Sequence, residues 1–195
     1  KAALLALRAL VPEWPIGREA YRLARREELP EADALVLLPA AIAGAPDARS
    51  VDSLLMLYAA TLHRTTACED AARVHGAVLR RTDDPSLRRI ATGGLGECAL
   101  QLGLDALAAG QGDRAEHWLR EAARADSASG VGRRALVALG DLHTAQGDLV
   151  GAAMAYQTVI NLSEPDDSLR RAAAERLARL GAADVPGAPA GSTVP

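Results

Sequence analysis

Two segments of this sequence align with each other without gaps, and this internal repeat constrains the fold more than any other feature. They cover residues 96–129 and 133–166, which gives each a length of 34 residues. A unit of about this length that recurs along a chain is typical of helical hairpins that stack on one another. The aligned pairs are Leu102 with Leu139, Gly103 with Gly140, Gly110 with Gly147, Ala115 with Ala152, Leu119 with Tyr156, Ala122 with Val159 and Ala125 with Leu162.

The composition supports helices rather than strands. Hydrophobic residues make up 49% of the chain, but aromatic residues make up only 3% and Phe is absent. The apolar residues are therefore mostly Ala, Leu and Val. Ala and Leu favour helices, whereas strands favour β-branched and aromatic residues. We therefore expect an all-α fold.

Small residues at matched positions indicate how the helices of each repeat pack. We expect Gly103 and Gly140 to lie where the partner helix crosses, because a larger residue there would push the two helices apart. Ala115 and Ala152 are predicted to do the same on the second helix. The larger side chains are predicted to fill the space between repeats: Leu102, Leu119, Leu139 and Tyr156.

Glycines and aspartates indicate the turns. Gly110 and Gly147 are predicted to end the first helix of each repeat, as a C-terminal glycine does. Asp113 and Asp148 are predicted to cap the second helices, with Glu116 completing a capping box behind Asp113. Residues 130–132 are expected to lengthen the linker between the two repeats.

These residues resemble the tetratricopeptide repeat (TPR) family. The segment LGDLHTAQGDLVGAAMAYQTVINLSEPD carries the family's small, small and aromatic positions at Gly140, Ala152 and Tyr156, and His143 stands where the family usually has an aromatic residue. The following SLRRAAAERLARLG resembles the helix after the repeat in bacterial envelope TPR proteins. The resemblance implies an α-solenoid with a right-handed superhelix and a capping helix over residues 167–181.

Upstream of residue 96 the repeat pattern decays. Residues 53–83 are predicted to form a degenerate helical pair, so TPR-like repeats are expected over residues 53–181. A helix is predicted to start at Asp84-Pro85 and to bend or break at the glycines 93, 94 and 96. Residues 1–52 are expected to be irregular helices, with a turn at 12–15 and a helix over 31–44 that is interrupted at Pro39. The tail 182–195 is rich in Gly, Pro and Ala and is expected to be flexible.

The resemblance also predicts where a protein partner binds. In TPR proteins the first helix of each repeat lines a concave groove, so the corresponding positions here form the predicted partner-binding groove. These residues are Glu97, Leu100, Gln101, Leu104, Leu107, Arg134, Val137, Asp141 and Thr144. The Lys and Asn residues with which some TPR co-chaperones bind a terminal carboxylate are absent from these positions.

No catalytic residue, cofactor or metal is predicted. His63, Cys68 and His75 lack the spacing of a zinc site, and we expect Cys68 in a loop and His75 in the core. Cys98 is expected to be a small buried hydrophobe. The glycines in TGGLGECA resemble a dinucleotide fingerprint, but no strand is predicted before them.

The net charge and the hydropathy of the chain argue against a nucleic-acid partner and against a membrane-spanning segment. The net charge of -3 is too close to neutral for a nucleic-acid surface, and no apolar run reaches the ~18 residues of a transmembrane helix. Arg-Arg pairs recur along the chain, and we expect them on a solvated, salt-bridged face. Burial against a neighbouring helix is preferred for Trp118 and Trp14 over a binding hot spot.

Two functional hypotheses follow. The first is a non-catalytic protein–protein interaction scaffold, an accessory subunit of a bacterial envelope or membrane-associated complex, located in the periplasm or at the envelope. The alternative is the helical-repeat arm of a larger cytoplasmic regulatory protein, which the start at Lys1 motivates. An enzyme on a helical fold is disfavoured because no nucleophile, base or phosphate loop has a recognisable arrangement.

Overall fold

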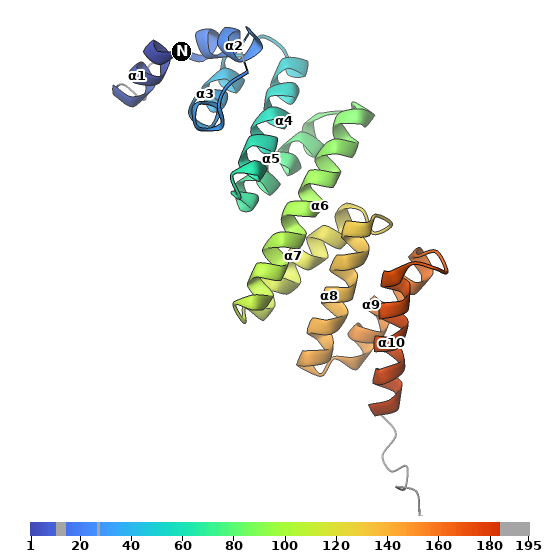
Figure 1. The fold of residues 1–195 in the computed structure, drawn as a ribbon. Coiled ribbons are helices and arrows are strands. Elements are labelled where there is room, and N and C mark those ends of the chain that lie inside the picture. Colours follow the sequence, from blue (N-terminus) through green and yellow to red (C-terminus); the bar gives the residue numbers. More distant parts are fainter. Residues whose placement is uncertain (11–14, 27, 184–195) are drawn as a thin grey trace, which may run out of the picture. The chain divides into compact units, whose positions relative to one another are not determined.

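The fold is all-α, as predicted. The computed structural model describes residues 1–10, 15–26 and 28–183, and within these ranges it contains ten helices and no strand (Figure 1). The helices are α1 Ala2–Leu10, α2 Gly17–Arg26, α3 Glu31–Ala43, α4 Ala48–Arg64, α5 Cys68–Arg81, α6 Pro85–Ala108, α7 Gly112–Ala125, α8 Gly130–Gln146, α9 Leu149–Leu162 and α10 Ser168–Ala183. Within the described ranges, no helix is both long and apolar enough to cross a membrane.

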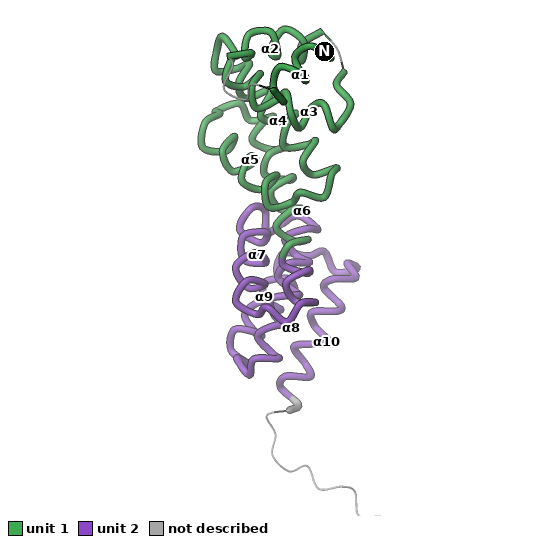
Figure 2. Tube along the Cα trace, turned by 90° about the vertical axis from the view of Figure 1, so that its left-hand side faces the viewer, with its two compact units in different colours: residues 1–102 green, residues 103–195 purple. Residues whose placement is uncertain are grey.

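The helices divide into two compact units. Unit 1 comprises residues 1–102 and unit 2 comprises residues 103–195, so α6 contributes to both (Figure 2). The turn predicted at 12–15, including Trp14, falls largely outside the described residues. The predicted tail begins inside the last turn of α10, and residues 184–195 lie outside the described residues.

In unit 2, consecutive helices pack as antiparallel neighbours. α7 packs against α8, α8 against α9, and α9 against α10, which also contacts α8. The core of the last three helices contains the fully buried Tyr156 and Val159 of α9, together with Val137 of α8, Ala152 of α9 and Ala173 of α10. This packing places the second repeat and the predicted capping helix in one hydrophobic cluster.

The predicted role of the two repeat glycines is confirmed. A Cβ atom on Gly103 would lie 2.7 Å from Cδ2 of Leu119, and one on Gly140 would lie 2.4 Å from Cε1 of Tyr156. Both distances are too short for a real side chain, so each glycine allows the aligned large residue of the next helix to pack against the backbone.

The turns follow the glycine prediction but only half of the capping prediction. Gly110 and Gly147 adopt positive φ angles of 69° and 79°, which favour glycine at a helix C-terminus. Asp148 caps α9 by accepting a hydrogen bond from the backbone N–H of Gly151 at 2.9 Å. The prediction for Asp113 is wrong: it lies inside the first turn of α7, and Gln111 occupies the cap position without a side-chain capping bond.

The linker predicted at 130–132 is also absent, because these residues form the first turn of α8. Ser129 caps that helix by accepting a hydrogen bond from the N–H of Gly132 at 3.0 Å. A Cβ on Gly132 would lie 2.0 Å from the carbonyl oxygen of Asp126, so the helix can start this close to the preceding turn only with glycine there.

Unit 1 contains a core formed by α2, α3 and α4. Ala20, Leu38 and Leu54 are buried in it, one from each helix. Contrary to the prediction, Pro39 does not interrupt α3, which runs through it from Glu31 to Ala43. Proline removes one backbone hydrogen bond, but the neighbouring Leu37 and Leu38 are fully buried, and their packing holds the helix together.

The helical pair predicted over 53–83 is confirmed as α4 and α5, with α4 beginning earlier, at Ala48. The predicted start of the next helix at Pro85 is confirmed, and Asp84 accepts hydrogen bonds from the N–H groups of Ser86 and Leu87. The break predicted at glycines 93, 94 and 96 is wrong, since α6 is continuous. Gly94 instead makes room for the imidazole of His75, whose Nε2 would lie 2.3 Å from an added Cβ.

Candidate functional site

The predicted groove residues of unit 1 lie on α6 with different exposures. Glu97 and Gln101 are exposed, whereas Leu100 is buried. Glu97 Oε2 lies 3.9 Å from Nδ1 of His63 on α4. Leu100, which is 6% exposed, therefore does not contribute to a surface.

The predicted groove residues of unit 2 are also divided. Leu104 and Leu107 are partly buried, and Leu107 packs against the cluster of Ala106, Ala115 and Leu142. On α8, Val137 is buried in the core, whereas three residues are exposed: Arg134, Asp141 and Thr144. The apolar positions of the predicted groove are thus largely covered by this chain itself, and the exposed ones are polar.

Asp141 and Thr144 are linked to the core of unit 2 through one tyrosine. The Tyr156 hydroxyl donates a hydrogen bond to Oδ1 of Asp141 at 2.8 Å and lies 3.3 Å from Oγ1 of Thr144. Arg176 Nε donates to the same Asp141 oxygen at 2.7 Å. Burial, and then the nearby Asp141 carboxylate, raise the pKa of Tyr156, and the Asp141 hydrogen bond raises the pKa of Arg176.

An exposed apolar surface lies elsewhere in unit 2, at the start of α9. Val150 is 72% exposed, Met154 is 67% exposed, and the preceding Leu149 is 38% exposed. Val150 and Met154 are four residues apart, so they lie on one face of the helix. We call these three residues the α9 surface. Sequence reasoning missed it because only the core positions of α9 were followed, although LVGAAMA is apolar on more than one face.

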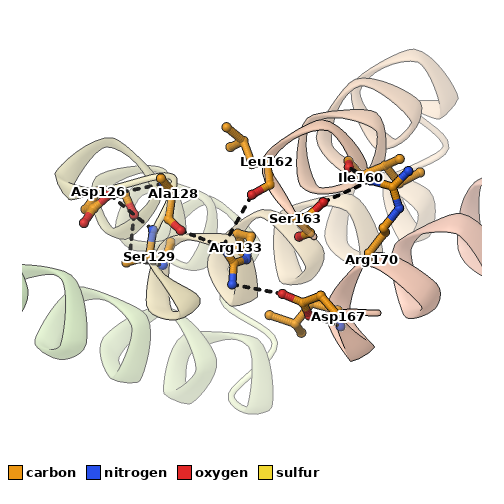
Figure 3. Close-up of polar contacts among 11 residues, drawn as sticks. Asp126, Ala128, Ser129, Arg133, Ile160, Leu162, Ser163, Asp167 and Arg170 are labelled. Carbon is orange, nitrogen blue, oxygen red and sulfur yellow. Dashed lines mark hydrogen bonds and ion pairs between the residues drawn. The ribbon is translucent and has the colours of Figure 1, made fainter. Parts of the chain in front are cut away.

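Three Arg-Arg pairs differ from the predicted solvated face, because their first arginine binds backbone carbonyls. Arg133 at the start of α8 donates to the carbonyl oxygens of Ala128 at 2.6 Å and Leu162 at 3.5 Å, and to Oδ2 of Asp167 at 3.0 Å (Figure 3). Its side chain is only 20% exposed. The carbonyl groups near helix C-termini lack partners within the helix, so this contact satisfies them.

The same arrangement recurs at two other helix starts. Arg170 of α10 donates to the carbonyl oxygens of Ile160 at 2.7 Å and Ser163 at 3.0 Å, at the end of α9 (Figure 3). In unit 1, Arg88 of α6 donates to the carbonyl of Leu79 at 2.8 Å and to that of Thr82 at 3.1 Å, at the end of α5. These arginines bind backbone carbonyls. Arg133 and Arg170 are partly buried, whereas Arg88 is exposed, as are the second members of the pairs, Arg89, Arg134 and Arg171.

A cluster of metal-binding side chain types lies in unit 1. His63 is in the last turn of α4, Cys68 is the first residue of α5 and Cys98 is on α6, and their ligand atoms all lie within 4.8 Å of one another. The expectation that Cys68 lies in a loop is wrong, because it begins a helix and is buried. The expected burial of Cys98 is confirmed. Burial, and then the contact with Cys68, raise the pKa of the Cys98 thiol to about 12.

A tight turn brings His63 and Cys68 together. Thr66 has a φ angle of 61°, in the left-handed region that β-branched residues rarely adopt. The turn is closed by hydrogen bonds from Thr66 N–H to the His63 carbonyl and from Ala67 N–H to the Leu62 carbonyl, both 3.0 Å. It reverses the chain within a few residues, so the end of α4 and the start of α5 lie side by side.

His75 joins the core of unit 1, as predicted, rather than this cluster. It is buried on α5, and its Nδ1 has no hydrogen-bond partner among the described residues. Burial, and then the charge of His63, lower the pKa of His75 to about 4. Sequence reasoning had grouped His63 and Cys68 with His75. The fold groups them with Cys98, whose distance along the chain gives no spacing signal.

The structure also shows where the glycine-rich segment TGGLGECA and Trp118 lie. The glycines of TGGLGECA lie inside the continuous helix α6, and no strand precedes them within the described ranges, so they lack the surroundings of a dinucleotide site. Trp118 is half-buried, and its ring meets that of His117 edge-on with 5.0 Å between centroids.

Comparison with known proteins does not assign a family. No protein-family model matches the chain, and no curated protein matches it. Among solved structures, the chain is similar to the crystal structure of BtubC (BKLC) from P. vanneervenii, with 17% sequence identity and a TM-score of 0.38. That match covers 97% of this chain and 91% of the other, but at this identity and TM-score it carries no conclusion about function.

Proposed function

We propose that this chain is a non-catalytic protein-interaction scaffold whose helix pairs stack as a TPR-like α-solenoid with a right-handed superhelix. The support from packing is that one contact recurs at equivalent positions of the two repeats. Gly103 receives Leu119, and Gly140 receives Tyr156. Both contacts join the two helices of one repeat, and α7 packs against α8, which joins one repeat to the next, as the stacked units of a solenoid require.

The observation that carries the interaction role is the α9 surface. Val150 and Met154 leave 72% and 67% of their surface in water while the core of the same helix is fully buried. Covering such side chains with a protein partner removes apolar area from water, at about 25 cal/mol for each Å². Methionine also adapts its unbranched side chain to the shape of a partner.

The exposed part of the predicted groove on the first helices stays part of the proposal as a second, polar surface. Arg134 on α8 is exposed, so it offers a positive charge to a partner. Asp141 and Thr144 are held by Tyr156, which gives them defined positions. Ordered polar groups of this kind can form hydrogen bonds to a protein partner.

For location and partner class, we propose an accessory subunit of a bacterial envelope or membrane-associated assembly. The support is the resemblance of residues 156–181 to the corresponding part of bacterial envelope TPR proteins. That segment forms α9 and the helix α10 that packs on it.

Affinity purification of the full chain under mild conditions tests the interaction role. The variant Val150→Glu/Met154→Glu places two charges on the α9 surface, and we expect it to lose a partner that the unmodified chain retains. The matched control is Gln157→Glu/Asn161→Asp, which changes two exposed residues four apart on the same helix. Retention of the same partner by the first variant, with both variants folded by circular dichroism, would contradict the proposal.

A further inference from the structure

A cluster of three possible metal ligands lies in unit 1, and each ligand comes from a different helix: His63 from α4, Cys68 from α5 and Cys98 from α6. Zinc bound by thiolate and imidazole has ligand bonds of about 2.3 Å and 2.0–2.1 Å, which in tetrahedral geometry separate the ligand atoms by roughly 3.3–3.8 Å. The three ligand atoms here lie within 4.8 Å of one another. Each ligand atom would therefore need to move by less than about 1 Å for all three to reach bonding distance of one ion.

The surroundings suit a bound ion. Both cysteines are buried, whereas the His63 side chain is 36% exposed, so the cluster has a shielded sulfur side and a solvent-facing imidazole. Cys68 is the first residue of α5, so its sulfur lies at the start of a helix, next to the end of α4. The Glu97 carboxylate lies 3.9 Å from His63 Nδ1, which is too far for a hydrogen bond but places a negative charge beside the imidazole.

The ligand types select the class of ion. Two sulfurs and one imidazole nitrogen are soft and borderline ligands, which favour Zn²⁺ or Cu⁺ over Mg²⁺ and Ca²⁺. Two thiolates also balance the charge of one divalent cation inside the unit. Binding of M²⁺ releases the two thiol protons to solvent, and no electron is transferred.

We propose that His63, Cys68 and Cys98 bind one Zn²⁺ ion, with the fourth position taken by water. The ion would join the end of α4, the start of α5 and the middle of α6, and so stabilise unit 1. This site shares no residue with the α9 surface, so the metal proposal can be tested independently of the proposed interaction role.

The test is metal titration of the full chain after reduction and removal of metal with a chelator. Zn²⁺ is titrated in competition with a chromophoric chelator, and Co²⁺ is used to detect thiolate-to-metal charge transfer and tetrahedral coordination. We expect one ion per chain, an increase in thermal stability on binding, and loss of at least about tenfold in affinity in Cys98→Ser.

Two further variants keep the outcome interpretable. His63→Gln changes a partly exposed residue and should fold, yet it should also weaken Zn²⁺ binding and remove the Co²⁺ spectrum. His117→Gln, an exposed histidine on α7, should bind like the unmodified chain. The proposal is overturned if the reduced chain binds no Zn²⁺, whether or not Cys68 and Cys98 form a disulfide on oxidation. It is also overturned if both histidine variants bind Zn²⁺ with equal affinity.

Discussion

The ring of Tyr156 lies across Gly140 so closely that a Cβ atom on the glycine would come within 2.4 Å of Cε1. The ring cannot easily move, because Tyr156 is 2% exposed and its hydroxyl is hydrogen-bonded to Asp141 at 2.8 Å. Arg176 of α10 holds the same carboxylate at 2.7 Å. One glycine thus sets the distance between α8 and α9, and the tyrosine connects both to α10.

Gly140→Ala should therefore destabilise unit 2, by about 1–3 kcal/mol, because an added methyl group overpacks this contact. The matched control is Gly93→Ala in the interior of α6, where an added Cβ meets nothing within 4 Å. That change should stabilise the helix by about 0.5–1 kcal/mol. Urea unfolding followed by circular dichroism measures both, and a gain in stability for Gly140→Ala would contradict the packing described.

Arg133 should contribute much more to stability than its neighbour Arg134. Removing the Arg133 guanidinium leaves the carbonyls of Ala128 and Leu162 and the Asp167 carboxylate without their donor. We expect Arg133→Ala to cost about 2–4 kcal/mol and Arg134→Ala to stay within about 0.5 kcal/mol. Chemical denaturation of the two variants tests this, and equal effects would show that the carbonyl contacts do not stabilise unit 2.

His75 should make the metal-free protein less stable in mild acid. Burial, and then the charge of His63, lower the pKa of His75 to about 4 in the folded chain, whereas an unfolded histidine titrates near 6.5. Between about pH 6.5 and pH 4, this histidine binds a proton in the unfolded state but not in the folded state. The free energy of unfolding therefore falls as the pH drops toward 4. With a chelator present, His75→Leu should show a shallower dependence across this interval. An unchanged slope would contradict the lowered pKa.

Thr66→Gly should stabilise unit 1. The φ angle of 61° costs a β-branched residue about 1–2 kcal/mol, and glycine adopts it freely. Part of this gain is lost because glycine also makes the unfolded chain more flexible, so we expect a net gain of about 0.5–1 kcal/mol. Thr65→Gly is the control, and it should destabilise the turn because the Thr65 hydroxyl donates to the carbonyls of Thr61 and Leu62. Thermal unfolding separates the two outcomes.

Much of the helical arrangement could be predicted from the sequence because it depends on local chemistry. The left-handed Gly147, the Asp148 cap and the start of α6 at Pro85 each follow from one residue type at one backbone position. The errors arose where tertiary packing decides. Pro39 and the glycines of α6 weaken helices in isolation, but burial of Leu38 and contact with His75 keep both helices continuous.

The candidate sites were less predictable, because they depend on residues that only the fold brings together. Cys98 meets His63 and Cys68 through a turn at Thr66 that the sequence gives no reason to expect, since threonine rarely adopts positive φ. The burial of Leu100 and Val137 also could not be predicted from their positions in the repeat. A repeat position indicates on which face of a helix a residue lies, but not how much of its side chain the neighbouring helices cover.

Photo-crosslinking in living cells tests the proposed scaffold role most directly. A photoreactive amino acid replaces Met154 on the α9 surface, and the control carries it at Arg179, an exposed residue of α10 in the same unit. We predict that position 154 gives a discrete protein adduct that position 179 does not, and that Val150→Glu abolishes it. Absence of any adduct at 154, or the same adducts at both positions, would contradict the role proposed for this protein.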